Sequence, residues 1–95
     1  MSQVRVMQPH AVSVEDAIGR MKEFEEMMAK YGARSTWSGS RARIQGTGVS
    51  GSIEVDPSQV VVTIQLGMLA RVAGVDPARL EGSIGRRLKA AFEGF

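Results

Sequence analysis

Apolar and polar residues alternate at every second position through much of the segment from Arg41 to Gly67. The alternation is interrupted twice, by Gly46-Thr47-Gly48 and by Asp56-Pro57-Ser58, which are residue types that form turns. A period of two is typical of a strand that buries one face, so the segment predicts consecutive antiparallel strands. The residues expected on the buried face are Ile44, Ile53, Val55, Val60, Val62, Ile64 and Leu66.

Two further strands are expected nearer the N-terminus. Residues 3–8 alternate in the same way, and Pro9 ends this strand because proline has no N–H to donate to a ladder. A short strand over residues 34–38 is centred on Trp37, and Gly39 lies in the turn that leads into the next strand.

Between Ser13 and Gly32 the spacing of apolar residues changes to three and four, which predicts an amphipathic helix of about five turns. Ser13 with Asp16 three residues later is a variant of the capping box. Gly32 is expected to end the helix in the left-handed conformation. The apolar stripe consists of Ala17, Met21, Phe24, Met28 and Tyr31, widened by Val14 and Ile18.

A second helix is expected to start at Pro77, because proline suits the first helical position and Asp76 is a good N-cap. Gly82 and Gly85 lie inside it, although a helical glycine costs about 1 kcal/mol relative to alanine. We therefore expect a close backbone approach on that face, with the sheet favoured over a second subunit as the neighbour. The buried stripe is expected to be Leu80, Ile84, Leu88, Ala91 and Phe95.

The predicted order of elements is β-α-β-β-β-β-α, and both helices have a single apolar face. Such a chain buries its apolar surface as a two-layer α+β domain, in which an antiparallel β-meander carries both helices on one face. The 95 residues are expected to form one domain over residues 1–95. The side chains expected on the outer face of the sheet are Arg41, Arg43, Gln45, Glu54, Thr63 and Gln65.

The composition excludes several classes of protein. Cysteine is absent, which excludes disulfides and thiolate metal sites and favours a reducing cytoplasm. No signal peptide is recognisable, and no apolar run approaches the ~20 residues of a membrane helix. Residues 1–33 carry four basic and five acidic side chains, whereas residues 34–95 carry eight and five, so the second part is mildly basic. A solvated basic face and a nucleic-acid-binding surface both fit this bias. The arginines of such a surface would be Arg34, Arg41, Arg43, Arg86 and Arg87.

The sequence contains no recognisable set of catalytic or metal-binding residues. A catalytic dyad or triad needs a base beside its nucleophile, and the single histidine, His10, has no metal-ligand spacing around it. We expect His10 to be a loop histidine that bonds to nearby backbone. The glycines at positions 46, 48 and 51 lie between strands, so we expect hairpin or bulge positions with positive φ and no phosphate loop. We therefore predict no catalytic residue, no metal and no cofactor.

Other side chains have a structural interpretation. Glu23, Glu25 and Glu26 are expected on a solvated helix face, and Trp37 in the core. Met21 and Met28 belong to the core stripe, which leaves Met27 and Met68 as adaptable contact residues if they are exposed. The segment MLARVAGV is not assigned to the core. It could pack beneath the second helix, form a contact in a homodimer or touch an apolar surface. Its candidate contact residues are Met68, Leu69, Val72 and Val75.

Several short patterns occur together and in order along the chain. They are Val4-Arg5-Val6 before Gln8-Pro9-His10, the helix end Lys30-Tyr31-Gly32, Trp37 before a turn, Gly48-Val49-Ser50-Gly51, the strand from Val60 to Gly67, and a last helix with Ile84 and Leu88. In these patterns the chain resembles the polyhydroxyalkanoic acid system proteins, small bacterial proteins named for their place beside polyester storage-granule genes. Two departures are Gln8, where the family usually has a basic residue, and a longer link into the last helix.

The resemblance implies an accessory role in polyhydroxyalkanoate metabolism, with a cytoplasmic, granule-associated location and the granule surface or granule proteins as partners. The family has no established catalytic residues, so none is carried over, and we predict a non-enzymatic protein. The alternatives are a carrier of small apolar ligands such as acyl chains and a weak nucleic-acid-binding module. The side chains that argue for a filled core, and so against a carrier, are Phe24, Met28, Trp37, Leu88 and Phe92.

Overall fold

The computed structural model describes residues 2–30, 32–46, 48–67, 74 and 76–92. The elements in chain order are β1 (Ser2–Pro9), α1 (Val14–Ala29), β2 (Ala33–Ser38), β3 (Arg41–Gly46), β4 (Val49–Val55), β5 (Gln59–Leu66) and α3 (Pro77–Phe92). This order and the α+β class confirm the prediction from the sequence. The segment MLARVAGV, apart from Gly74, lies outside the described residues.

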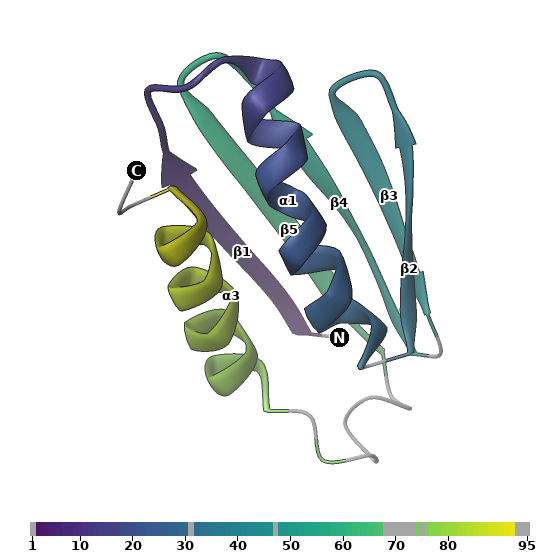
Figure 1. Cartoon of the computed structure of the whole chain (residues 1–95). Helices are drawn as coiled ribbons and strands as arrows, with labels where there is room; N and C mark the ends of the chain where they lie inside the picture. The colour runs from purple at the N-terminus through teal and green to yellow at the C-terminus, as the bar shows by residue number, and fades with distance from the viewer. Residues whose placement is uncertain (1, 31, 47, 68–73, 75, 93–95) are drawn as a thin grey trace.

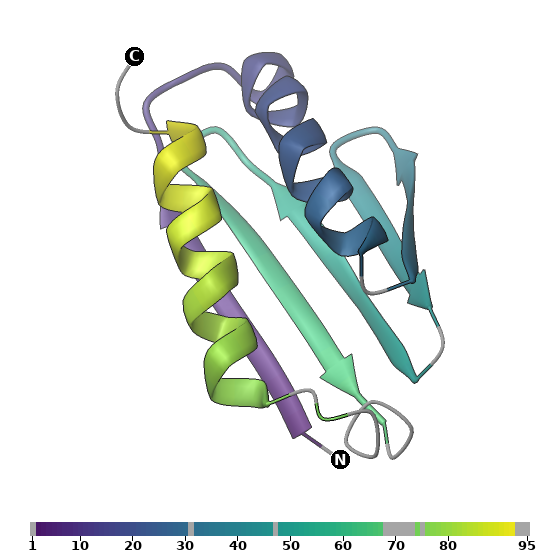
Figure 2. The ribbon, with the colours of Figure 1, turned by 60° about the horizontal axis from the view of Figure 1, so that its bottom comes forward.

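The five strands form one antiparallel sheet in the order β1-β5-β4-β3-β2 (Figure 1). Strands β2 to β5 are a meander, as predicted, and β1 pairs along β5 with Val4 opposite Ile64. The two edges of the sheet are therefore β1 and β2. Both helices lie on the same face, α3 over β1 and α1 nearer the β2 edge (Figures 1 and 2).

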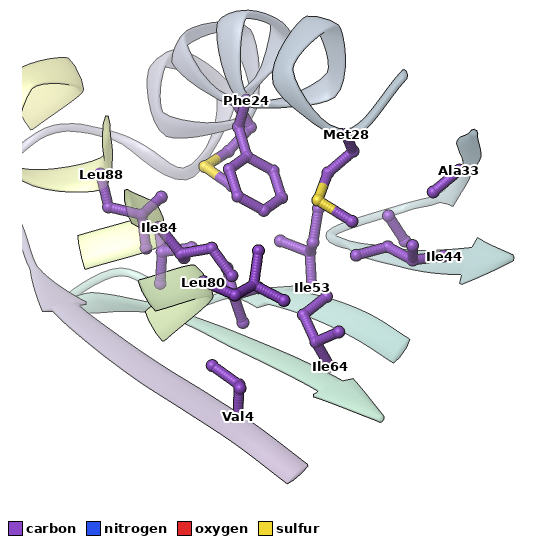
Figure 3. Packing of buried hydrophobic residues seen from close by; sticks show 14 of the residues in the cluster. Val4, Phe24, Met28, Ala33, Ile44, Ile53, Ile64, Leu80, Ile84 and Leu88 are labelled. Carbon is purple, nitrogen blue, oxygen red and sulfur yellow. The ribbon is translucent and has the colours of Figure 1, made fainter. Parts of the chain in front are cut away.

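The core fills the space between the helices and the sheet. Phe24 and Met28 of α1 point toward the sheet, and Ile44, Ile53 and Ile64 point back toward them (Figure 3). Helix α3 adds the predicted stripe of Leu80, Ile84, Leu88 and Ala91, all of which are buried. Tyr31 and Phe95, the other two residues expected in the stripes, lie outside the described residues.

The helix starts follow the capping residues. The Ser13 hydroxyl accepts a hydrogen bond from the Asp16 N–H at 3.1 Å, and Asp76 Oδ1 accepts one from the Ala78 N–H at 3.0 Å. Gly32 follows α1 with a φ of 75°, the left-handed conformation that ends many helices.

The glycines near the β3–β4 hairpin have two different roles. Gly48 has the expected positive φ of 72° in the turn. For Gly46 and Gly51 the expectation of positive φ is wrong, because neither residue is left-handed and both belong to regular ladders. A Cβ atom at Gly51 would lie 2.1 Å from the carbonyl oxygen of Thr63, so glycine is needed there for space.

The favoured prediction, a close approach of the sheet to Gly82 and Gly85, is also wrong. Apart from its chain neighbours and the backbone of its own helix, no heavy atom of the described residues lies within 4 Å of a Cβ placed at Gly85. At Gly82 the nearest such atom belongs to the flexible guanidinium of Arg86, at 3.5 Å. The face of α3 that carries these glycines therefore has room for side chains, and the glycines weaken the helix without serving the sheet.

We expect the substitution Gly85→Ala to raise the free energy of unfolding by about 0.5–1 kcal/mol, because alanine restricts the unfolded chain and meets no steric obstacle. Urea unfolding followed by circular dichroism measures the change. A loss of stability would show that another part of the molecule packs against this face.

Candidate functional site

Because α1 and α3 lie on one face of the sheet, the side chains that point away from them form a surface that no described helix covers, here called the open face. The six residues predicted for this face all belong to it, since their strand neighbours on either side point into the core. Its central members are Arg5, Met7, Arg34, Thr36, Arg41, Arg43, Gln45, Ser50, Ser52, Glu54, Val61, Thr63 and Gln65.

The strand register orders these side chains in rows across the sheet. The central row runs through Arg5, Thr63, Ser52, Arg43 and Thr36, one residue from each strand. The row on one side of it contains Gln65, Ser50, Gln45 and Arg34, and the row on the other side contains Val61, Glu54, Arg41 and Ser38. The open face is thus polar over most of its area, with one exposed large apolar side chain, Met7, at the β1 edge among the described residues.

The open face is positively charged. It carries four arginines, at positions 5, 34, 41 and 43, and a single carboxylate, Glu54, among the residues that the structure describes. Arg41 Nη2 lies 3.9 Å from Glu54 Oε1, but 76% and 54% of these side chains are exposed to solvent. An ion pair that is so well hydrated contributes little to stability, so both groups stay available to a ligand.

A shallow hollow of about 500 Å³ lies on the open face above β2, β3 and β4. A second hollow overlaps it toward β5, and the two share Arg43, Gln45, Gly51 and Ser52. Hydroxyl, amide and guanidinium groups therefore surround a concave site without a buried acid or base.

His10 lies at a different place, the end of β1. Its Nδ1 accepts a hydrogen bond from the Val12 N–H at 3.2 Å, so Nε2 carries the proton and donates to the Asp56 carbonyl oxygen at 2.8 Å. The Phe92 ring stacks on the imidazole with a centroid distance of 5.2 Å. The expectation that His10 bonds to nearby backbone is confirmed, and its contacts join β1, the β4–β5 turn and α3.

Arg20 also contacts Phe92 and the end of α3, and the sequence did not predict these contacts. Its Nη1 donates to the Ala91 carbonyl oxygen at 2.9 Å, its Nη2 to Asp16 Oδ2 at 3.0 Å, and its guanidinium lies 5.7 Å from the centre of the Phe92 ring. A cation near the last carbonyls of a helix is favourable, so Arg20 ties α1 to the end of α3. The described residues contain no group of three or more histidine, aspartate and glutamate side chains placed to bind a metal ion.

Asp56 organises the β4–β5 turn. Its Oδ1 accepts hydrogen bonds from the backbone N–H groups of Ser58 and Gln59, both at 2.8 Å, and from the Ser58 hydroxyl at 3.0 Å. The bond from the Ser58 N–H is the main cause that holds the pKa of Asp56 below its ordinary value of 3.8, since it stabilises the ionised carboxylate.

This pKa shift predicts a loss of stability in acid. The folded pKa is below the unfolded one, so the stabilisation is fully present above about pH 3.8 and is lost as the pH falls through the lowered value. Wild-type protein should exceed Asp56→Asn in stability at pH 7, and the difference should shrink below pH 3.8. Urea unfolding of both proteins across this range tests it, with Ser58→Ala as a control that keeps the backbone donor. A difference that does not change with pH would contradict the assignment.

The structure separates the five arginines that the sequence grouped together. Arg34, Arg41 and Arg43 lie on the open face, whereas Arg86 and Arg87 are exposed on α3 in the other layer, so the five do not form one surface. Arg5 joins the first three because β1 pairs with β5. The alternation of Arg5 with Val4 and Val6 indicated that Arg5 points outward. The sequence did not indicate which strand pairs with β1.

The other side chains whose burial or exposure was predicted can be compared with the structure where it describes them. Trp37 is partly buried against the core, as expected, and its Nε1–H donates to Glu25 Oε1. The prediction of a solvated Glu25 is therefore wrong, because this carboxylate is a partly buried partner of Trp37, while Glu26 is exposed. Met21 and Met28 are buried. The candidate contact residues Met68, Leu69, Val72 and Val75, and the side chains of Glu23 and Met27, lie outside the described part of the chain.

Fold and site together define a two-layer α+β protein with one uncovered, basic sheet face. A model of the family described as "Putative polyhydroxyalkanoic acid system protein" matches residues 4–92, and the chain belongs to this family. The NMR structure of PA4090 from Pseudomonas aeruginosa is similar with a TM-score of 0.60, covering 100% of this chain and 88% of that one. The two are 8% identical in sequence, so this likeness concerns the fold alone.

A search of curated proteins finds no match for the chain. Neither of the described helices is long and apolar enough to cross a membrane.

Proposed function

We propose that this protein is a non-enzymatic accessory factor that acts at polyester storage granules in the bacterial cytoplasm, and that it binds its partner through the open face. The observation that carries the proposal is the placement of both helices on one face of the sheet (Figure 2). This arrangement leaves a whole polar surface with four arginines exposed. Membership of the polyhydroxyalkanoic acid system family supplies the granule context.

The state of the titratable groups supports a binding role over catalysis. Both ring nitrogens of His10 are engaged with backbone groups, and the ring is covered on one side by Phe92. On the open face the single described carboxylate, Glu54, is exposed and has no base beside it. A general acid or base must reach a substrate with a free proton donor or acceptor, and both nitrogens of His10 are already bonded to the backbone.

The packing gives less support to the alternative of an acyl-chain carrier. Met21, Phe24, Ile53, Ile64 and Ile84 fill the layer between helices and sheet. The two hollows over the sheet are lined mainly by polar residues and lie on its outer face. A carrier needs an apolar space within the core, so the geometry favours a surface-binding role.

Sedimentation with native granules tests the proposal. Wild-type protein should pellet with purified granules well above the level of albumin, and Arg43→Glu should reduce the pelleted fraction about fivefold by reversing a central charge of the open face. The matched control is Arg86→Glu, the same change on an exposed residue of α3, which should pellet like wild type. Wild-type protein that remains in the supernatant with albumin would refute granule binding.

A further inference from the structure

We infer that the open face docks an extended, acidic segment of a protein partner, which lies along β3 in the hollow above β2, β3 and β4. The inference deepens the proposed function and rests on it for the use of this face. It means that the open face binds a polypeptide at the granule and does not bind the polyester itself.

The first argument is charge. The hollow is lined by Arg41 and Arg43, and Arg34 lies on β2 opposite Gln45, which also lines it. Arg5 adds a fourth positive charge on the same face. Glu54 is the single described carboxylate to oppose them. Guanidinium groups bind carboxylates through two parallel hydrogen bonds, so aspartate and glutamate side chains are their natural partners in a protein.

The second argument is the spacing of the arginines. Arg41 and Arg43 are two residues apart on β3 and point to the same side, so their Cα atoms are separated by about 6.6 Å. An extended peptide repeats its side chains on one face with the same spacing. A segment with an acidic residue at every second position can therefore place successive carboxylates against Arg41 and Arg43 without bending.

The third argument is the mixture of donors and acceptors around the hollow. Thr36, Ser52 and Gln45 can each donate and accept, and Glu54 accepts. A polypeptide offers both N–H donors and C=O acceptors to such a lining. A polyester chain has ester carbonyl acceptors but no donor, so it could not bond to Glu54.

Nucleic acid fits this surface less well. Proteins that bind single strands use aromatic side chains as stacking platforms, and the described residues of the open face include none, since Trp37 faces the helix layer. Phosphodiesters also have no donor for Glu54, whereas the backbone of a peptide offers N–H groups. Nucleic acid is therefore the competing outcome of the test.

Fluorescence anisotropy with labelled peptides tests the inference on the intact protein. A peptide with glutamate at every second position should bind, and the same peptide with glutamine should bind at least ~10-fold more weakly because it loses the charged hydrogen bonds. The double variant Arg41→Glu/Arg43→Glu should lose at least ~10-fold in affinity for the acidic peptide. Arg86→Glu/Arg87→Glu changes the net charge equally on α3 and should keep the affinity. Circular dichroism confirms that each variant is folded.

Three results would overturn the inference. They are absence of binding to the acidic peptide, equal losses in the two double variants, and tighter binding of a single-stranded oligonucleotide than of the peptide. Bare polyester particles and native granules separate this inference from the proposed function. If the protein pellets with native granules but does not bind the peptide, the acidic partner alone is refuted. If it binds the peptide but pellets neither with bare polyester particles nor with native granules, the granule role alone is refuted.

Discussion

Replacing Gly51 with alanine is expected to lower the free energy of unfolding by about 3 kcal/mol, at the upper end of the cost of overpacking. The new Cβ atom would lie 2.1 Å from the carbonyl oxygen of Thr63 and 3.1 Å from the Cα of Ile64. Both are backbone atoms of β5, which cannot rotate away as a side chain can. The strands β4 and β5 would have to separate, and their ladder hydrogen bonds would lengthen.

Urea unfolding of the Gly51→Ala variant measures this effect, and Gly85→Ala is the matched control. The two substitutions add the same methyl group, but the site on α3 is open and the site in β4 is closed by backbone. The signs of the two stability changes should therefore be opposite. A Gly51→Ala variant as stable as wild type would show that β4 and β5 are farther apart than this structure places them.

The substitution Phe24→Ala is expected to lower the free energy of unfolding by about 3–5 kcal/mol, because it removes a buried ring and leaves a cavity. Phe24 is 3% exposed and points from α1 into the space above Ile53 (Figure 3). Phe24→Leu fills most of the same volume and should cost less than about 1.5 kcal/mol. Denaturant unfolding of both variants gives the comparison.

The same pair of variants tests the carrier alternative. If the core is filled, wild-type protein and Phe24→Leu should bind no apolar fluorescent probe in the folded state, because packed side chains leave no space of that size. Strong binding by wild-type protein would instead favour an acyl-chain carrier. Nearly equal stabilities of Phe24→Ala and Phe24→Leu would indicate that the ring is not packed as described.

The substitutions at Gly51 and Phe24 concern the open face as well as stability. Gly51 lines both hollows, and its close contact with Thr63 brings β4 and β5 together beneath them. Phe24 holds α1 against the other side of the sheet. Binding by variants of the open face must therefore be compared under conditions in which each variant is fully folded.

Local pattern was sufficient for the elements and their faces. The period-two alternation in β3 to β5 assigned Arg41, Arg43 and Gln45 outward and Ile44 inward, because successive side chains of a strand point to opposite faces. The three-and-four spacing in both helices identified the buried stripes for the same geometric reason. Asp76 and Ser13 marked the helix starts because their side chains satisfy N–H groups within a few residues.

The tertiary structure decided which distant segments became neighbours. Pairing of β1 with β5 brought Arg5 to the open face, and the packing of α1 against α3 and β2 placed Arg20 beside Ala91 and Glu25 beside Trp37. It also left Gly82 and Gly85 without the contact with the sheet that was expected of them, and it required Gly51 for space. Periodicity records only which side of an element is buried. Contacts between residues far apart in sequence depend on how whole elements pack, and no short pattern in one segment specifies its partner in another.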